Sequence, residues 1–262
     1  MVLSPSAIAL YLKCPRWFFY QNLLKLDAGE ESAAATFGKL VHHLLEQSED
    51  YDHLKDLLEK EEIQDLTPLQ QAQLKIRLEK TFEALNQSGY FEKSYIFLYK
   101  EIKLGPCMIE DMQLSGRTDL IREHADRHLE IVDYKTSKNQ YLSHSPDTNR
   151  SGILKALSPI DWDIPEPDRY DKREYQLPFY WLMAQSQFLD RRIDVTIQVV
   201  RESGCSSFTV THDELEAGKP YLLELIRHVS ESLYSTSHFE PLGRPEIDCR
   251  MCAYATICEG AS

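Results

Sequence analysis

Apolar residues recur at helical spacing through the first third of the chain. Over residues 36–48, one face of a helix would collect Phe37, Leu40, Val41, Leu44 and Leu45. The same kind of pattern, with proline and capping residues at the starts, predicts further helices. One of these helices begins after Ser4-Pro5, and the others cover 16–24, 51–63 and 68–87.

The middle of the chain changes to the character of strands. Four short segments are rich in apolar or β-branched residues and are separated by turn signals, so they predict strands over 95–104, 108–114, 116–123 and 129–134. Gly105-Pro106 supplies one turn, and residues 123–126 supply another.

The last part of the chain predicts fewer elements. Residues 137–171 are polar and contain four prolines, so we expect a long loop, a kind of segment that is usually functional or disordered. After it we expect a helix over 172–189, a strand over 193–200, an edge strand over 206–211 and a helix over 213–234. The order of helix, three to four strands, helix and strand predicts an α/β fold with a mixed sheet flanked by helices.

Composition and charge narrow the class of protein. Hydrophobic residues make up 42% and charged residues 27%, as in ordinary soluble globular proteins. No apolar run is long enough for a membrane span, and the N-terminus does not have the pattern of a signal peptide, so we expect a cytoplasmic protein with no membrane partner. The net charge of −13 argues mildly against a nucleic-acid partner, although a metal-dependent nuclease must gather carboxylates at its site.

Two carboxylates and a lysine form the first candidate site. Asp119 and Asp133 are fourteen residues apart on successive predicted strands, and Lys135 shares a strand face with Asp133. The carboxylates would bind a hard cation such as Mg²⁺ or Mn²⁺, which lowers the pKa of a bound water and polarises a phosphodiester. The lysine would orient a water or stabilise charge on the phosphate. The alternative is a surface strand pair with ordinary charges.

The order of several motifs resembles one nuclease family. Gly-Arg-Thr-Asp-Leu-Ile (116–121) followed by Ile-Val-Asp-Tyr-Lys-Thr-Ser (131–137) resembles the paired catalytic motifs of the RecB-type branch of the PD-(D/E)xK nucleases. Gly38-Lys39-Leu40-Val41-His42 resembles that family's upstream helix, and Gln176-Leu177-Pro178-Phe179-Tyr180 resembles its later helix motif. The opening segment, 6–24, resembles the start of members that carry an iron–sulfur cluster.

This resemblance implies a restriction-endonuclease-like core, formed by 36–135 and 172–211 within a single nuclease domain over 1–262. It implies that His42, Asp119 and Asp133 hold Mg²⁺ or Mn²⁺, that Lys135 is the catalytic lysine, and that Gln176 and Tyr180 support it. Without the other motifs, His42 would be interpreted as an ordinary helix residue. Gln176 and Tyr180 would be interpreted as the polar edge of a packed helix.

Four cysteines form the second candidate site. Cys249, Cys252 and Cys258 lie close together in sequence, and Cys14 lies far upstream. Four thiolates suit either Zn²⁺ or an iron–sulfur cluster, and His238 is an alternative zinc ligand. The one-plus-three arrangement resembles AddB-type helicase–nuclease subunits and CRISPR-associated spacer-processing nucleases, which implies a 4Fe–4S cluster in a region formed by 1–30 and 235–262.

The function expected is that of a metal-dependent DNA nuclease, an exonuclease acting on DNA ends or single strands in DNA repair, recombination or defence. The alternative is a catalytically weak DNA-binding scaffold with a structural zinc site on the four cysteines. The chain has no phosphate-binding loop of a motor, so we expect it to work alone or beside a helicase or a CRISPR or recombination protein. CRISPR-associated nucleases commonly have glutamate at the position of Asp133, which favours the RecB/AddB type.

Overall fold

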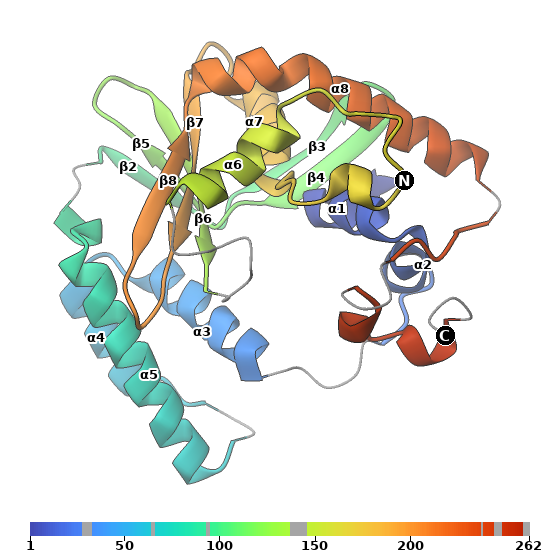
Figure 1. Ribbon diagram of the computed structural model, residues 1–262. Coiled ribbons are helices and arrows are strands. Elements are labelled where there is room, and N and C mark those ends of the chain that lie inside the picture. Colours follow the sequence, from blue (N-terminus) through green and yellow to red (C-terminus); the bar gives the residue numbers. More distant parts are fainter. Residues whose placement is uncertain are drawn as a thin grey trace.

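The computed structural model describes residues 1–27, 33–63, 66–92, 95–136, 146–236, 238–243 and 248–258, and it contains two sheets (Figure 1). The larger sheet has the order β2-β5-β6-β7-β8. Its strands are β2 (Phe97–Lys100), β5 (Leu120–Glu123), β6 (Leu129–Lys135), β7 (Ile193–Val199) and β8 (Ser206–Val210). The central pair, β6 and β7, is parallel, and the other neighbours are antiparallel.

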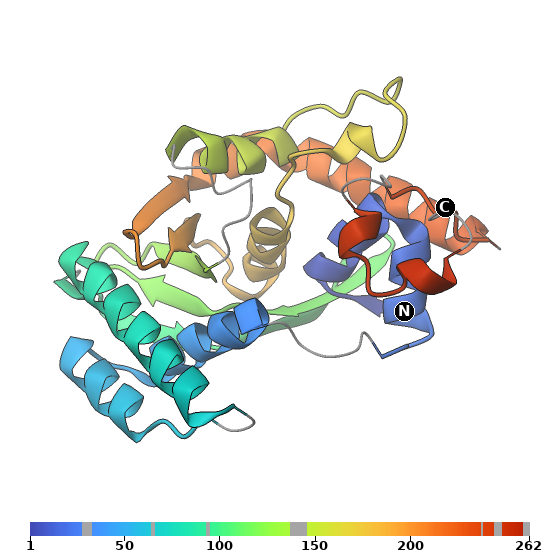
Figure 2. The ribbon, with the colours of Figure 1, turned by 60° about the horizontal axis from the view of Figure 1, so that its bottom comes forward.

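The smaller sheet has the order β1-β4-β3 and extends from the larger one toward the N-terminal helices (Figure 2). Its strands are β1 (Val2–Leu3), β4 (Met112–Arg117) and β3 (Lys103–Ile109). Next to it lie the first helices of the chain. They are α1 (Pro5–Lys13), α2 (Pro15–Phe18) and the π-helical turn η1 (Phe19–Leu23).

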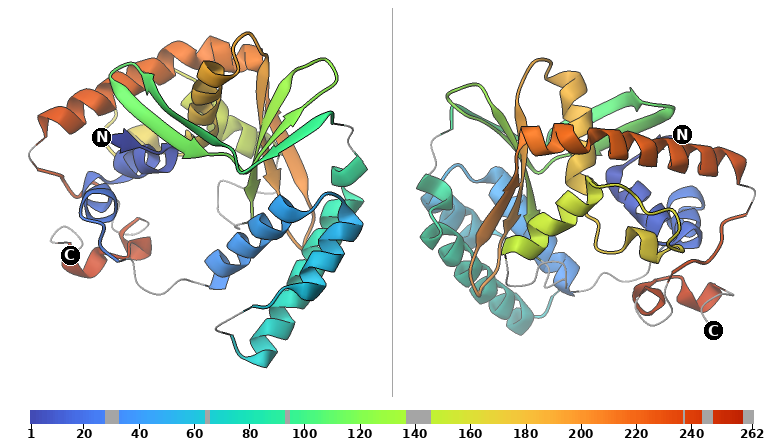
Figure 3. Two further views of the ribbon diagram at one scale, coloured as in Figure 1. Left: turned by 180° about the vertical axis from the view of Figure 1, so that it is seen from behind. Right: turned by 45° about the horizontal axis from the view of Figure 1, so that its top comes forward.

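Alternating side chains of the larger sheet supply two separate cores. Leu120 and Val132 face one side, where α3 (Ala33–Gln47), α4 (Tyr51–Lys60) and α5 (Pro68–Gln87) cover them. Ile121 and Ile131 face the other side, where α6 (Pro146–Ala156), α7 (Gln176–Gln187) and α8 (His212–Ser235) pack (Figure 3). Because successive residues of a strand point to opposite faces, this pattern fixes the register of β5 against β6.

Local signals explain where the helices begin. Ser4 Oγ accepts a hydrogen bond from the Ala7 N–H at 3.1 Å, and proline follows at the first position of α1. At the start of α5, Thr67 Oγ1 accepts from the Gln70 N–H, and Gln70 Oε1 accepts from the Thr67 N–H at 2.9 Å. This reciprocal pair satisfies two amides that have no partner inside the helix.

The structure corrects the prediction of a long loop over 137–171. Residues 137–145 lie outside the described residues, but α6 covers 146–156 and a short 3-10 turn, η3, covers Asp168–Tyr170. Few apolar residues interrupt this polar stretch, yet Ile153, Ala156 and Leu157 are buried in the core. Gly218 of α8 permits this packing, since a Cβ there would lie 2.4 Å from Leu157 Cβ.

Several boundaries also differ from expectation, since the segments predicted as single strands over 95–104, 108–114 and 116–123 are divided among β2, β3, β4 and β5. Gly105-Pro106 does not end a strand: β3 continues through it, with a register shift against β4 between Leu104 and Cys107. The helix expected from residue 172 begins at Gln176 instead. The predicted α/β class is confirmed, and the mixed sheet is divided into two. Among the described helices, none is both long and apolar enough to cross a membrane.

Candidate active site

The β5–β6 pair places the two predicted carboxylates side by side. Leu120 pairs with Val132, so Asp119, one residue before β5, lies beside Asp133 of β6. Asp119 Oδ2 accepts a hydrogen bond from the Tyr134 N–H at 2.8 Å, which holds this carboxylate against β6. Asp133 is buried, with 4% of its surface exposed. The structure therefore brings together two residues that the sequence separates by fourteen positions.

Lys135 joins this carboxylate pair to α7. Its Nζ lies 2.7 Å from Asp133 Oδ2 and donates a hydrogen bond to Gln176 Oε1 at 2.9 Å. Gln176 Nε2 in turn donates to the Tyr180 hydroxyl at 3.2 Å, one helical turn further along α7. The predicted supporting pair and the predicted lysine are thus one connected network, with Gln176 at the first position of its helix.

His42 reaches the same carboxylates from the opposite layer. It projects from α3, and its Nδ1 lies 3.3 Å from Asp119 Oδ1. Its ring packs edge-on against Tyr134, whose hydroxyl is hydrogen-bonded to that of Tyr90. The site therefore lies at the end of the sheet where α3 and α7, from opposite faces, approach β6.

Two glycines permit this close approach. A Cβ on Gly116 of β4 would lie 2.6 Å from Tyr180 Cε1, so only glycine leaves room for the Tyr180 ring. A Cβ on Gly38 of α3 would lie 3.0 Å from Thr136 Oγ1, just after β6. Both glycines belong to the motifs on which the resemblance rests, and here each has a packing reason.

Burial and charge shift the ionisation of the site. Burial raises the pKa of Asp133 to about 6, with the neighbouring Asp119 adding to the effect and Lys135 opposing it. Burial on its own would lower the pKa of Lys135, but the charges of Asp133 and Glu174 outweigh it and raise that pKa. Burial also opposes the charged form of His42, and its hydrogen bond and charge interaction with Asp119 raise its pKa instead.

The donor atoms fit a divalent cation. Asp133 Oδ2 is buried and, among the described residues, has no partner with hydrogen-bond geometry; its 2.7 Å contact with Lys135 is an ion pair. Two adjacent carboxylates repel each other. A cation between them would reduce this repulsion and offset the free-energy cost of burying their charge. In the part of the chain that the structure describes, no group of three or more His, Cys, Asp or Glu residues is already arranged as a metal site.

Sequence reasoning gave no role to Glu174. This residue precedes α7, and its Oε1 accepts a hydrogen bond from the Gln176 N–H at 3.0 Å. Its charge also acts on both Asp133 and Lys135. The only signal in the sequence was its position two residues before Gln176, inside a segment for which a helix was predicted.

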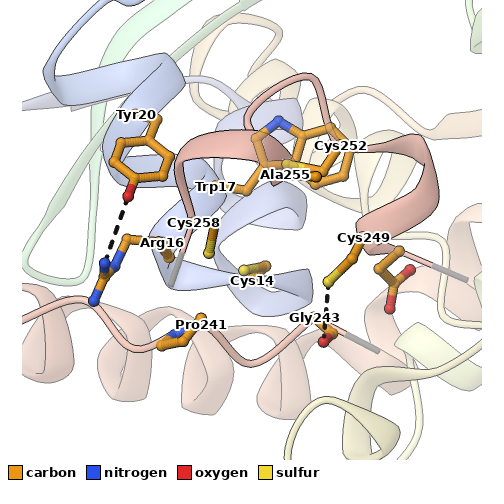
Figure 4. Close-up of a pocket in the computed structure, with 11 residues that line it drawn as sticks. Cys14, Arg16, Trp17, Tyr20, Pro241, Gly243, Cys249, Cys252, Ala255 and Cys258 are labelled. Carbon is orange, nitrogen blue, oxygen red and sulfur yellow. Dashed lines mark hydrogen bonds between the residues drawn. The ribbon is translucent and has the colours of Figure 1, made fainter. Parts of the chain in front are cut away.

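The four predicted cysteines line one pocket (Figure 4). Cys14 lies between α1 and α2 and is buried, while Cys249, Cys252 and Cys258 come from two short 3-10 turns, η4 (Cys249–Met251) and η5 (Ala255–Ile257), and the residues after them. Burial raises the pKa values of Cys249 and Cys252, and the charges of the neighbouring cysteines add to the effect. Among the described residues, no three of these thiols are already gathered as a metal site.

Other contacts hold the two ends of the chain together. Arg16 Nε donates to the Phe239 carbonyl, and the Phe19 and Phe239 rings stack with centroids 5.0 Å apart. Tyr254, close to the C-terminus, donates its hydroxyl proton to the Leu26 carbonyl at 2.8 Å. His238, the alternative zinc ligand, does not line the cysteine pocket; its Nε2 lies near Arg16 and Glu240.

Comparisons with known proteins agree with this architecture. The crystal structure of "Putative exonuclease" from Eubacterium rectale is 13% identical, with a TM-score of 0.54, over 92% of this chain and 84% of that one. That of SSO0001 is 11% identical, with a TM-score of 0.43, over 100% and 87%. The first of these shows likeness of fold alone, and the TM-score of the second is too low to support a conclusion. No curated protein sequence matches the chain significantly.

The decisive match is to a family model. The model of the PD-(D/E)XK nuclease superfamily matches residues 2–259, nearly the whole chain. With the mixed sheet between two helical layers, this match confirms the expected restriction-endonuclease-like fold. Nucleases of this superfamily hydrolyse phosphodiesters and typically use Mg²⁺ or Mn²⁺. The chain belongs to the PD-(D/E)XK nuclease superfamily.

Proposed function

We propose that this protein is a divalent-metal-dependent deoxyribonuclease, an exonuclease that acts on DNA ends or single strands. The observation that carries the proposal is the network Asp119, Asp133, Lys135 and Gln176, with His42 beside it. A scaffold that only holds DNA would not need a partly buried lysine paired with a buried carboxylate. Even a paired set of charges is costly to remove from water, which favours a catalytic reason for this pair.

The residues divide the work according to their chemistry. Asp119 and Asp133 supply oxygen ligands and His42 a nitrogen ligand, a donor set that suits Mg²⁺ or Mn²⁺. When bound, the metal supplies Lewis-acid activation of a water and of the phosphate. Lys135 would direct its positive charge at the phosphate, because the hydrogen bond to Gln176 fixes the position of its Nζ. Tyr180 keeps Gln176 in place through the second hydrogen bond.

A cleavage assay on end-labelled strands tests the proposal. Anaerobically purified protein should degrade single-stranded DNA or DNA ends in Mg²⁺ or Mn²⁺, and EDTA should abolish cleavage. An RNA strand of the same sequence, cleaved much more slowly, would support the choice of DNA. DNA binding without cleavage in either metal would favour the alternative, a catalytically weak scaffold.

His42→Ala should weaken metal affinity more than it disturbs folding. An imidazole ligand suits Mn²⁺ better than Mg²⁺, so wild-type activity should be higher in Mn²⁺, and the variant should need more of either metal. The loss expected is about 10–100-fold in apparent metal affinity. Titration of cleavage against metal concentration measures it, with His53→Ala on α4 as the control. Identical titrations for wild type and His42→Ala would show that His42 is an ordinary helix residue.

We further propose a 4Fe–4S cluster on Cys14, Cys249, Cys252 and Cys258, in a region made of residues 1–30 and 235–262. The support is chemical: the pocket presents four sulfur donors, the set that such clusters use. The same four donors suit zinc as well; the histidine that would have served as an alternative zinc ligand lies away from the pocket. In this proposal, residues 1–262 act as one nuclease domain, and the cluster ties its ends together.

The biological setting follows from the same resemblance. A RecB- or AddB-type nuclease would act in DNA repair, recombination or defence, beside a helicase or a recombination or CRISPR protein. Its cytoplasmic location stays a prediction. Co-purification of the tagged protein with a motor subunit is the observation that would support such a partnership.

A further inference from the structure

A glutamate side chain, that of Glu174, contacts the start of α7. Gln176 is the first residue of this helix, so its N–H has no acceptor within the helix. Glu174 Oε1 accepts that N–H at 3.0 Å, although the residue before the helix, Tyr175, makes no side-chain cap. A carboxylate is well suited to this place, because a helix N-terminus favours negative charge.

Glu174 is itself held in place from the neighbouring helix. Its N–H donates to the Gly152 carbonyl of α6 at 3.0 Å. Gly152 also lies against Lys172 and Glu174: a Cβ added to it would stand 3.4 Å from the Lys172 carbonyl oxygen and 3.6 Å from Glu174 Cβ. The backbone of residue 174 therefore has a fixed support outside the loop to which it belongs.

We propose that Glu174 is a positioning residue for the reaction: its carboxylate fixes the first residue of α7, and with it the Gln176 side chain that holds Lys135. The inference rests on the proposed function and deepens it. The hydrogen bonds run in one chain, from Glu174 to the Gln176 backbone, and from the Gln176 side chain to both Lys135 and Tyr180. Removing the first bond would free the residue on which the other two converge.

The charge of Glu174 is consistent with this location. Burial has the largest effect on the pKa of Lys135 and lowers it. The charge of Asp133 raises this pKa, and the charge of Glu174 raises it further by a smaller amount. The proposal itself depends on the hydrogen-bond geometry and not on this shift.

Three variants test the inference. Glu174→Ala removes the acceptor, and Glu174→Gln keeps an acceptor oxygen while removing the charge. Glu216→Ala is the matched control, because Glu216 of α8 also accepts a hydrogen bond from a glutamine of α7, Gln185, near the far end of that helix. For Glu174→Ala we expect kcat to fall about 10–100-fold, as for other residues that orient a ligand or catalytic group. KM for DNA should change by no more than about twofold, because the groups affected act on the reacting phosphate.

Glu174→Gln and Glu216→Ala test whether the loss of activity comes from losing the acceptor at the start of α7. Glu174→Gln should recover most of the activity, and Glu216→Ala should match wild type. Wild-type kcat for Glu174→Ala, or equal losses for the Ala and Gln variants, would overturn the inference while leaving the nuclease function intact.

Hydrogen exchange separates this inference from the proposed function. Exchange at the Gln176 amide should be faster in Glu174→Ala than in wild type, Glu174→Gln or Glu216→Ala. If wild type itself fails to cleave DNA, the proposed function fails. The exchange data still decide whether Glu174 fixes the start of α7, since unchanged exchange would overturn it.

Discussion

Asp133→Asn should abolish cleavage while leaving a folded protein. The amide has the size of the carboxylate but lacks the charge that would hold a divalent cation beside Asp119. Metal activation contributes several kcal/mol to such reactions, so a loss of about a thousandfold or more is expected. Lys135 would lose its ion-pair partner and keep its hydrogen bond to Gln176. End-labelled DNA in Mg²⁺ and in Mn²⁺ provides the measurement, and circular dichroism checks the fold.

Asp126→Asn is the matched control for that variant. Asp126 lies in the turn between β5 and β6, so it belongs to the same hairpin, and 75% of its side chain is exposed. It should cleave like wild type. DNA binding should survive in Asp133→Asn better than cleavage does. Contacts between the protein and the phosphates of the DNA do not depend on one carboxylate. Full cleavage by a folded Asp133→Asn protein would remove Asp133 from the reaction.

The sequence predicted the elements that build the site because their signals are local. The apolar and β-branched residues of 129–134 belong to a strand that the structure buries on both faces, and the helical spacing over 36–48 reflects burial on one face. The same reasoning missed α6, since its buried apolar residues, Ile153 and Ala156, are few in a polar stretch, and the packing of Leu157 just after it depends on Gly218 of a distant helix. It also ended a strand at Gly105-Pro106, where pairing with β4 resumes at Cys107 and carries the strand on.

Motif order placed the site residues better than any pattern of hydrophobicity. His42, Asp119, Asp133, Lys135, Gln176 and Tyr180 meet in the structure as one group. Glu174 was missed because its role depends on a backbone N–H that is free only if the helix begins at Gln176. A helix predicted from residue 172 would have placed Glu174 inside the helix and satisfied that amide differently.

Cys14→Ser should remove the iron and lower the melting temperature. Cys14 is the one cysteine of the four that comes from the N-terminal helices, so its loss would open a clasp between the two ends of the chain. A cross-link that closes a long loop contributes a few kcal/mol in the simple entropy model. In a protein of this size 1 kcal/mol corresponds to about 2–4 °C, so we expect a fall of about 5–10 °C. Iron analysis, the visible absorbance spectrum and thermal unfolding under anaerobic conditions measure the three consequences.

The fall should be limited, because Cys14 is not the only tie between the termini. Arg16 still binds the Phe239 carbonyl, and Lys13 Nζ still lies 3.3 Å from the buried Asp248. Cys205→Ser is the matched control: its thiol is partly buried and contacts the Arg201 carbonyl, away from the pocket, so iron content should be unchanged. Brown wild-type protein that contains iron, and a colourless Cys14→Ser variant, would support the cluster. Stoichiometric zinc without iron in the wild type would replace the cluster with a structural zinc site. Neither metal, with all four thiols freely titratable in native protein, would remove both.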